Sequence, residues 1–73
     1  MRLNGAKIRR TRLLSGLTKS GAASKAEISD ASWARAEQGA SMSPPNCLRI
    51  AKALDLELVE LVPAESESAL QSA

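Results

Sequence analysis

The lysines and arginines are the residues of this chain that could do chemistry, and they are placed unevenly. Between residues 1 and 26 every charged side chain is basic, whereas between residues 55 and 73 every charged side chain is acidic. A basic half is typical of a protein that binds a polyanion, and an acidic tail helps to keep it soluble. Ordinary solvated helix faces would carry the same charges, so charge alone leaves both interpretations open.

Catalytic chemistry has little support in the sequence. The chain has no histidine. It also has no Gly-rich phosphate loop, no nucleophile beside a base and no pair of carboxylates on one expected helix face. The single cysteine, Cys47, excludes an internal disulfide, is too little for a zinc site and is expected to be a small buried residue. We therefore expect no enzyme activity, no metal and no cofactor.

Length and composition indicate one small helical domain. A chain of 73 residues lies near the lower limit for a core that folds without disulfides or metals. Its apolar residues are mostly Ala and Leu, with one aromatic residue, which favours helix over sheet. No signal peptide or membrane-spanning segment is visible, so we expect a cytoplasmic protein with no membrane partner.

Two short helices joined by a tight turn are predicted between residues 16 and 39. Thr18 can cap the first of them, which covers about residues 19–25, and Ser29 can cap the second, which runs to Glu37. Small proteins use two helices packed across a short turn to place a helix end in the DNA major groove. This pair is therefore the part of the chain expected to meet nucleic acid.

The remaining elements should pack around that pair. A first helix is expected over residues 4–15, and its apolar face should consist of Ala6, Ile8 and Leu13. The prolines of residues 40–45 forbid helix continuation, so the next helix should begin near Asn46. The apolar run 56–62 could be a strand or a last helical turn, and the helices before it favour a helix. Residues 63–73 should be a flexible acidic tail.

Ordered motifs run along residues 3–62. They are Ile8-Arg9…Arg12…Gly16-Leu17-Thr18, Ser29…Arg35-Ala36-Glu37-Gln38-Gly39, Ile50-Ala51-Lys52-Ala53-Leu54 and Leu58…Glu60-Leu61. Their order and spacing resemble the Cro/repressor (lambda-repressor-like) helix-turn-helix family. The resemblance implies an all-α, compact five-helix domain over residues 1–62, whose third helix enters the major groove of double-stranded DNA. It further implies a phage or bacterial transcriptional regulator, with no small-molecule effector.

The resemblance also assigns residues to the DNA. It implies base or groove contacts by Ser29, Asp30, Ala31, Ser32 and Arg35. It implies phosphate contacts by Lys19, Thr18, Arg9, Arg10 and Gln38. Arg35 is the strongest of these, because a guanidinium can bridge guanine O6 and N7. Solvated surface charge is the alternative for Arg9 and Arg10. Asp30 would be repelled by phosphates unless it accepts from a cytosine amino group, and a role at the helix N-terminus is favoured.

Other positions have structural roles in the family. Arg12 and Glu37 stand where an ion pair is common, with phosphate contact as the alternative for Arg12. Trp33 stands where Ile or Val is usual, beside Ala22 and Ala36 where larger residues are usual, so an exchange of core volume is expected. The predicted core consists of Ile8, Leu17, Ala22, Ile28, Trp33, Ala36, Cys47, Ile50, Leu54, Leu58 and Leu61.

The sequence departs from the family in its turn and on its reading helix. Glu27 occupies a turn position that normally carries glycine, where a left-handed backbone would cost a larger residue about 1 kcal/mol. Ala31 and Ala34 cannot hydrogen-bond to bases. The alternative function is therefore a protein-interaction module, such as an antitoxin-like or anti-repressor subunit. A homodimer is expected, formed either in solution or only on DNA, with Leu56, Val59 and Val62 at its interface.

Overall fold

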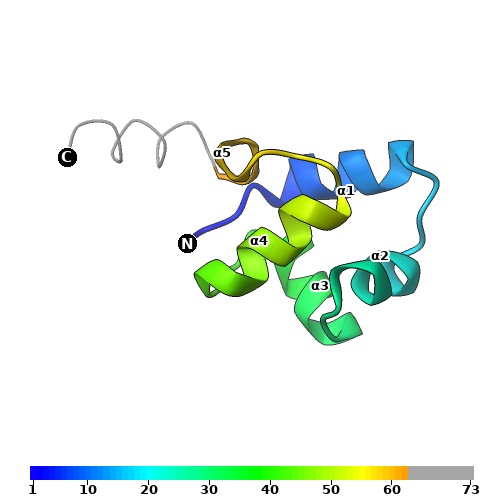
Figure 1. Ribbon diagram of the computed structural model, residues 1–73, viewed down its shortest axis with the longest axis horizontal. Helices are drawn as coiled ribbons and strands as arrows, with labels where there is room; N and C mark the ends of the chain where they lie inside the picture. The colour runs from blue at the N-terminus through cyan, green and yellow to red at the C-terminus, as the bar shows by residue number, and fades with distance from the viewer. Residues whose placement is uncertain (63–73) are drawn as a thin grey trace.

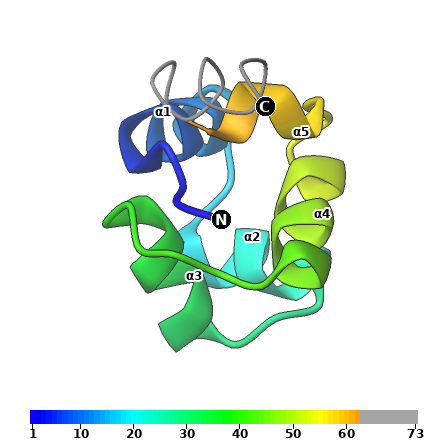
Figure 2. The same cartoon turned by 90° about the vertical axis from the view of Figure 1, so that its left-hand side faces the viewer.

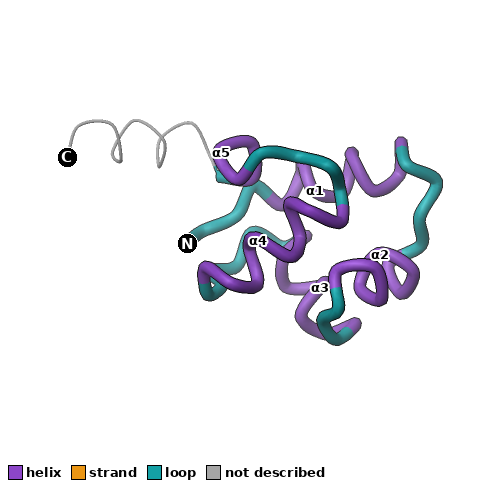
Figure 3. The backbone as a smooth tube through the Cα atoms, in the orientation of Figure 1, coloured by secondary structure: helices purple, strands orange, loops and turns teal. Residues whose placement is uncertain are grey.

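The computed structural model describes residues 1–62 and folds them into helices (Figure 1). The helices are α1 (Gly5–Leu14), α2 (Lys19–Ala26), α3 (Asp30–Glu37), α4 (Pro44–Ala53) and α5 (Leu58–Leu61). Within residues 1–62, β-structure is limited to an isolated bridge between Arg2 and Ser41, and the connections between helices are loops (Figure 3). The all-α, five-helix prediction is confirmed. The predicted tail, residues 63–73, lies outside the described residues.

Most of the helices begin where the sequence places a capping residue. The side chains of Asn4, Thr18 and Ser29 each accept a hydrogen bond from the backbone amide three residues further on, at 3.2, 2.9 and 3.1 Å. These bonds satisfy amides that have no partner inside the first turn of a helix. At α5 the Glu57 amide donates to Glu60 Oε2 at 2.8 Å, as in a capping box.

Helix α4 begins earlier than the sequence predicted. Pro44 and Pro45 form its first turn and do not belong to the preceding loop, so the prediction of a start near Asn46 was wrong. A proline at the first helical position has a suitable φ and lacks an amide that would have no partner there. The prolines therefore start a helix at this point, although they could not continue one.

The helices form a ring around the core. Contacts join α1 to α3, α3 to α2, α2 to α4, α4 to α5, and α5 back to α1. Figure 2 looks at this ring, with α1 and α5 on one side and α2 and α3 on the other. Trp33, Ile8, Ile50 and Leu61 lie fully buried in its centre. Helix α3 therefore has one side on the core and the other side free.

The predicted core is present, with additions. Leu17, Ile28 and Leu58 are partly buried against it, and the other predicted core residues are buried. The core also contains residues that were not predicted, namely Leu3, Ala23, Ala26, Ala51 and Ala53.

The inward face of α1 differs from the predicted one. Ala6 and Leu13 are exposed, and Gly5, Ile8 and Arg12 form the buried stripe. A Cβ on Gly5 would overlap the Glu37 carbonyl, so glycine allows α1 to approach the end of α3 closely.

The three apolar residues expected at a dimer interface differ in how far their own chain covers them. Leu56 packs partly buried against the core, and Val62 is only 6% exposed. The prediction of Val62 as an interface residue is therefore corrected, because it closes the core of its own chain, and the prediction for Leu56 stays open. Val59 is 48% exposed and remains available to a second copy.

Candidate nucleic-acid interface

The turn between α2 and α3 depends on a left-handed residue. Glu27 ends α2 with φ 60° and ψ 39°, and the Ile28 amide donates to the Ala23 carbonyl at 3.0 Å. Glycine is favoured at such a helix end because it has no Cβ to clash. Arg49 of α4 supports the turn, since its Nη1 donates to the Glu27 carbonyl at 3.3 Å. The backbone at Glu27 is thus left-handed, although the residue is not glycine.

Helix α3 has a buried side that packs on the core and a side that is exposed. Trp33 and Ala36 are buried, and Ala34 is half-buried. Of the residues assigned to base reading, Ser29, Asp30, Ala31 and Arg35 are exposed, and Ser32 is half-buried. Ala31 and Arg35 thus lie opposite the buried residues, whereas Ser29 and Asp30 lie at the N-terminal tip of α3.

The N-terminal tip of α3 is held by serines. Ser29 Oγ accepts from the Ser32 amide, and the two serine hydroxyls lie 2.9 Å apart. Ser20 of α2 donates to Asp30 Oδ2 at 2.7 Å. The tip of α3 is therefore tied both to its own first turn and to α2. The bond between Ser20 and Asp30 was not predicted, because its partners come from different helices.

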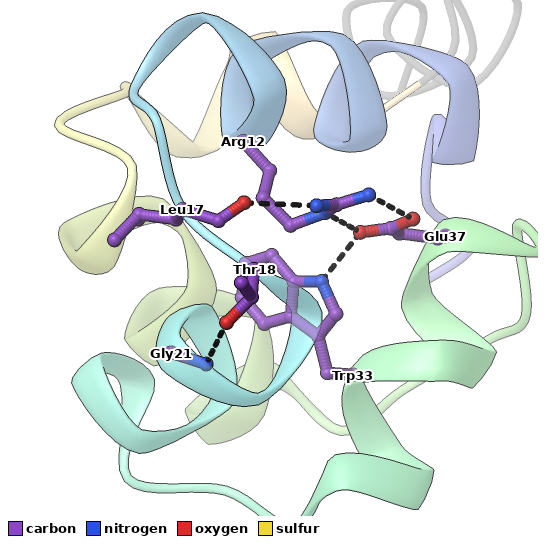
Figure 4. A network of polar contacts seen from close by, with 6 residues as sticks. All are labelled: Arg12, Leu17, Thr18, Gly21, Trp33 and Glu37. Carbon is purple, nitrogen blue, oxygen red and sulfur yellow. Dashed lines mark hydrogen bonds and ion pairs between the residues drawn. The ribbon is translucent and has the colours of Figure 1, made fainter.

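A buried carboxylate anchors α3 from behind (Figure 4). Arg12 Nε lies 2.5 Å from Glu37 Oε2, and the Arg12 and Glu37 side chains are only 8% and 6% exposed. Arg12 Nη1 also donates to the Leu17 carbonyl at 2.9 Å, and Trp33 Nε1 donates to Glu37 Oε2 at 2.6 Å. The contacts of Arg12 are thus intramolecular. They fix α3 against α1 and against the loop that leads to α2.

The part played by Trp33 in this network was missed at the level of sequence. The signal was the spacing of Trp33 and Glu37, which are four residues apart and therefore neighbours on one helix face. An indole N–H normally finds a hydrogen-bond partner when it is buried. A buried tryptophan one turn before a buried glutamate thus pointed to this contact.

The residues assigned to phosphate contacts do not all lie together. Lys19 is exposed in the first turn of α2, and Gln38 is exposed at the end of α3. Thr18 uses its hydroxyl oxygen to cap α2. Arg9 and Arg10 lie on α1, whose buried stripe faces inward. Because a helix turns by about 100° per residue, Arg10 points away from that stripe, and the structure does not bring it to α3.

Further cations lie beside the turn. Lys25, Arg49 and Lys52 line a hollow of about 350 Å³ between α2 and α4, together with Glu27. Lys25 and Lys52 occupy the last turns of their helices, where a positive charge favours the helix dipole. That role accounts for them without a ligand.

Cys47 is buried in α4, and its Sγ lies 3.7 Å from the Met42 carbonyl oxygen. Burial removes the thiol from water and raises its pKa above the ordinary value of 9.0. Residues 1–62 contain no cluster of three His, Cys, Asp or Glu side chains that could hold a metal ion. No helix in the same range has the length and apolar character needed to cross a bilayer.

A helix-turn-helix with a capped and anchored second helix defines the class of this protein. The chain belongs to the helix-turn-helix domain family, whose model matches residues 5–64. The predicted family resemblance is thereby confirmed.

One solved protein structure is similar to this chain over most of its length. It is the restriction-modification controller protein C.AhdI from Aeromonas hydrophila. The two chains share 30% identity, and the match has a TM-score of 0.71 and covers 77% of this chain and 86% of that chain. No curated protein matches the chain in sequence. The family and this likeness support a DNA-binding transcription regulator.

Proposed function

We propose that the chain is a sequence-specific regulator that binds double-stranded DNA with α3 in the major groove. The observation that carries the proposal is the division of α3 between its two sides. One side is fixed by Arg12, Trp33 and Glu37, Arg35 is exposed on the other side, and Asp30 is exposed at the N-terminal tip. A helix that contacts bases in the major groove must be held rigidly on its core side and must present polar side chains on its exposed side.

Arg35 is proposed to read guanine, and Lys19 to contact the phosphate backbone. An arginine fork matches guanine O6 and N7, and a lysine acts on phosphate as a point charge. Ser29 and Gln38, at opposite ends of α3, are proposed to help set its position on the duplex. The likeness to a protein named as a controller supports a regulatory output, which would follow from occupation of promoter DNA.

Two copies are proposed to bind two half-sites, as a dimer in solution or only on the operator. One small domain reads few base pairs, and half-sites about one helical turn apart need two reading helices. Val59 of α5 and Leu48 of α4 are exposed apolar residues on helices that contact each other. We assign the contact between copies to these residues.

Selection of duplexes from a random pool tests the function. A recovered palindrome supports both DNA reading and the pairing of copies, and repetition at raised salt should weaken binding steeply through counterion release. Lack of any affinity for duplex DNA at low salt would reject the proposal.

The alternative is a module that binds another protein through α3. The exposed Ala31 and the half-buried Ala34 favour it, because they offer contact area without hydrogen bonds to bases. Reversal of the charges of Lys19 and Arg35 to Glu separates the two functions. It should abolish DNA binding in a regulator and spare complex formation in a protein-binding module.

A further inference from the structure

The tips of α2 and α3 are joined by a hydrogen bond that the proposed function does not yet explain. Ser20 Oγ donates to Asp30 Oδ2 over 2.7 Å. Ser20 belongs to the first turn of α2, Asp30 is the first residue of α3, and both are exposed. The bond therefore lies at the surface, beside the end of α3 that would enter the groove.

Asp30 is not the residue that caps α3. Ser29 makes the capping bond, since its Oγ accepts from the Ser32 amide at 3.1 Å. The charge of Asp30 suits the positive end of the helix, as the sequence had suggested. Within residues 1–62, however, the side-chain hydrogen bond of Asp30 is the one from Ser20. Its carboxylate is thus held toward α2 and is not folded back over the helix end.

The chemistry of this pair limits which ligand groups it can meet. A serine hydroxyl has a single proton, and in Ser20 that proton is directed to Asp30. A carboxylate has no proton to donate. The second oxygen of Asp30 and the remaining lone pairs of Ser20 Oγ are therefore acceptors only. A ligand group that binds beside Ser20 and Asp30 must therefore donate a hydrogen bond.

Base pairs differ in the donors that they present in the major groove. Cytosine presents its N4 amino group, whereas guanine presents acceptors at N7 and O6 and thymine presents an acceptor at O4. Adenine presents an amino group beside the acceptor N7, which repels a carboxylate. Phosphate oxygens are acceptors as well. Cytosine is therefore the base whose groove edge matches the acceptor pair.

We propose that Asp30 selects a cytosine in each half-site by accepting from its N4 amino group. Ser20 is the positioning residue, because it holds one oxygen of the carboxylate and leaves the other for the base. The inference rests on the proposed function, since it requires α3 in the major groove. The carboxylate of Asp30 is repelled by the charge of DNA, and only a duplex with cytosine at this position offsets that repulsion through its N4 amino group. The repulsion therefore adds to the selectivity for cytosine.

Base selection by the parent chain and by Asp30→Asn tests the proposal. The parent chain should select a C·G pair at one position of each half-site, about five- to tenfold over the other pairs. Asp30→Asn should move the preference at that position to A·T, because an asparagine amide donates to adenine N7 and accepts from N6. The bases selected at the other positions should stay the same. Asparagine has nearly the shape of aspartate, so the fold should persist, as a thermal melt followed by circular dichroism would show.

Ser20→Ala tests the positioning role separately. The preference for cytosine should fall to about twofold, while affinity for random-sequence duplex changes by less than about twofold. Ser24→Ala is the matched control, because Ser24 is another exposed serine of α2. This control should change neither the base preference nor the affinity.

The outcomes separate this inference from the proposed function. A parent chain that selects a palindrome without the C·G pair overturns the role of Asp30, with no variant needed. An Asp30→Asn variant that binds duplex and selects the same bases as the parent also overturns it. Full cytosine preference in Ser20→Ala overturns the positioning role. A parent chain that binds no duplex at low salt overturns the proposed function, and this inference with it.

Discussion

The indole N–H of Trp33 donates to Glu37 Oε2 over 2.6 Å, one helical turn further along α3. Trp33 is fully buried and the Glu37 side chain is 6% exposed, so water has little access to this bond. Arg12 Nε donates to the same oxygen. The orientation of α3 against α1 therefore depends on one carboxylate that two donors share.

Trp33→Phe should separate the hydrogen bond from the bulk of the ring. Phenylalanine keeps most of the apolar contact and removes the N–H, so one bond to a charged acceptor is lost. We expect the free energy of unfolding to fall by about 1.5–3 kcal/mol. Urea denaturation followed by far-ultraviolet circular dichroism measures this change in free energy. Tryptophan fluorescence cannot be used, because the variant lacks the only tryptophan of the chain.

Trp33→Ala provides the comparison for that variant. Loss of the whole ring should cost about 3–5 kcal/mol, enough to unfold so small a domain. A cooperative, near-native melt of Trp33→Ala would contradict the assignment of Trp33 to the core.

Leu3 and Leu14 form a matched pair for testing the segment before α1. Leu3 lies outside every helix and is 2% exposed, whereas Leu14 is 80% exposed at the end of α1. Leu3→Ala should cost about 2–5 kcal/mol, because it leaves a cavity in the core. Leu14→Ala should change the free energy of unfolding by less than about 0.5 kcal/mol. Equal effects of the two variants in denaturation experiments would contradict the burial of this segment.

The sequence predicted well the features that depend on neighbouring residues. The caps at Thr18 and Ser29 were predicted because a side chain needs only the amide three residues on. The ion pair of Arg12 and Glu37 came from the family resemblance and is present in the structure. Local chemistry and a familiar order of motifs were sufficient in these cases.

Features that depend on tertiary packing were missed. Leu13 has the apolar character of a core residue but lies on the outer side of α1, and Leu3 fills the core without a helical pattern to reveal it. Val62 was assigned to a dimer interface because the sequence cannot show that its own core covers it. The bond between Ser20 and Asp30 depends on how α2 packs against α3, which no local rule gives.

Glu27→Gly should stabilise the turn between α2 and α3. Glu27 has φ 60°, a conformation that costs a residue with a Cβ about 1 kcal/mol and glycine almost nothing. Part of the gain is offset by the greater freedom of glycine in the unfolded chain. We expect a net gain of up to about 0.5 kcal/mol in urea denaturation.

Lys25→Gly is the control for that substitution. Lys25 is helical and exposed in the last turn of α2. Glycine at this position should destabilise the protein by about 1 kcal/mol. Loss of stability in both glycine variants would argue against strain at Glu27.

The buried thiol of Cys47 should make stability depend on pH in the alkaline range. Burial raises its pKa above the ordinary value of 9.0, so the folded chain keeps the proton at a pH where the unfolded chain releases it. The unfolded state then binds fewer protons, and the free energy of unfolding must fall as pH rises. The contribution of the protonated thiol is fully present below the unfolded pKa and is lost as pH rises through the folded pKa.

Cys47→Ala isolates the contribution of the thiol to the pH dependence of stability. Below about pH 8 the variant should be less stable than the parent by a constant amount, set by the lost packing of the sulfur. As pH rises above about 9, the parent should lose stability faster than the variant, and the difference between them should narrow. Urea denaturation of both proteins across this range measures the difference. A gap that stays constant or widens with pH would contradict a thiol whose protonated form is favoured by burial.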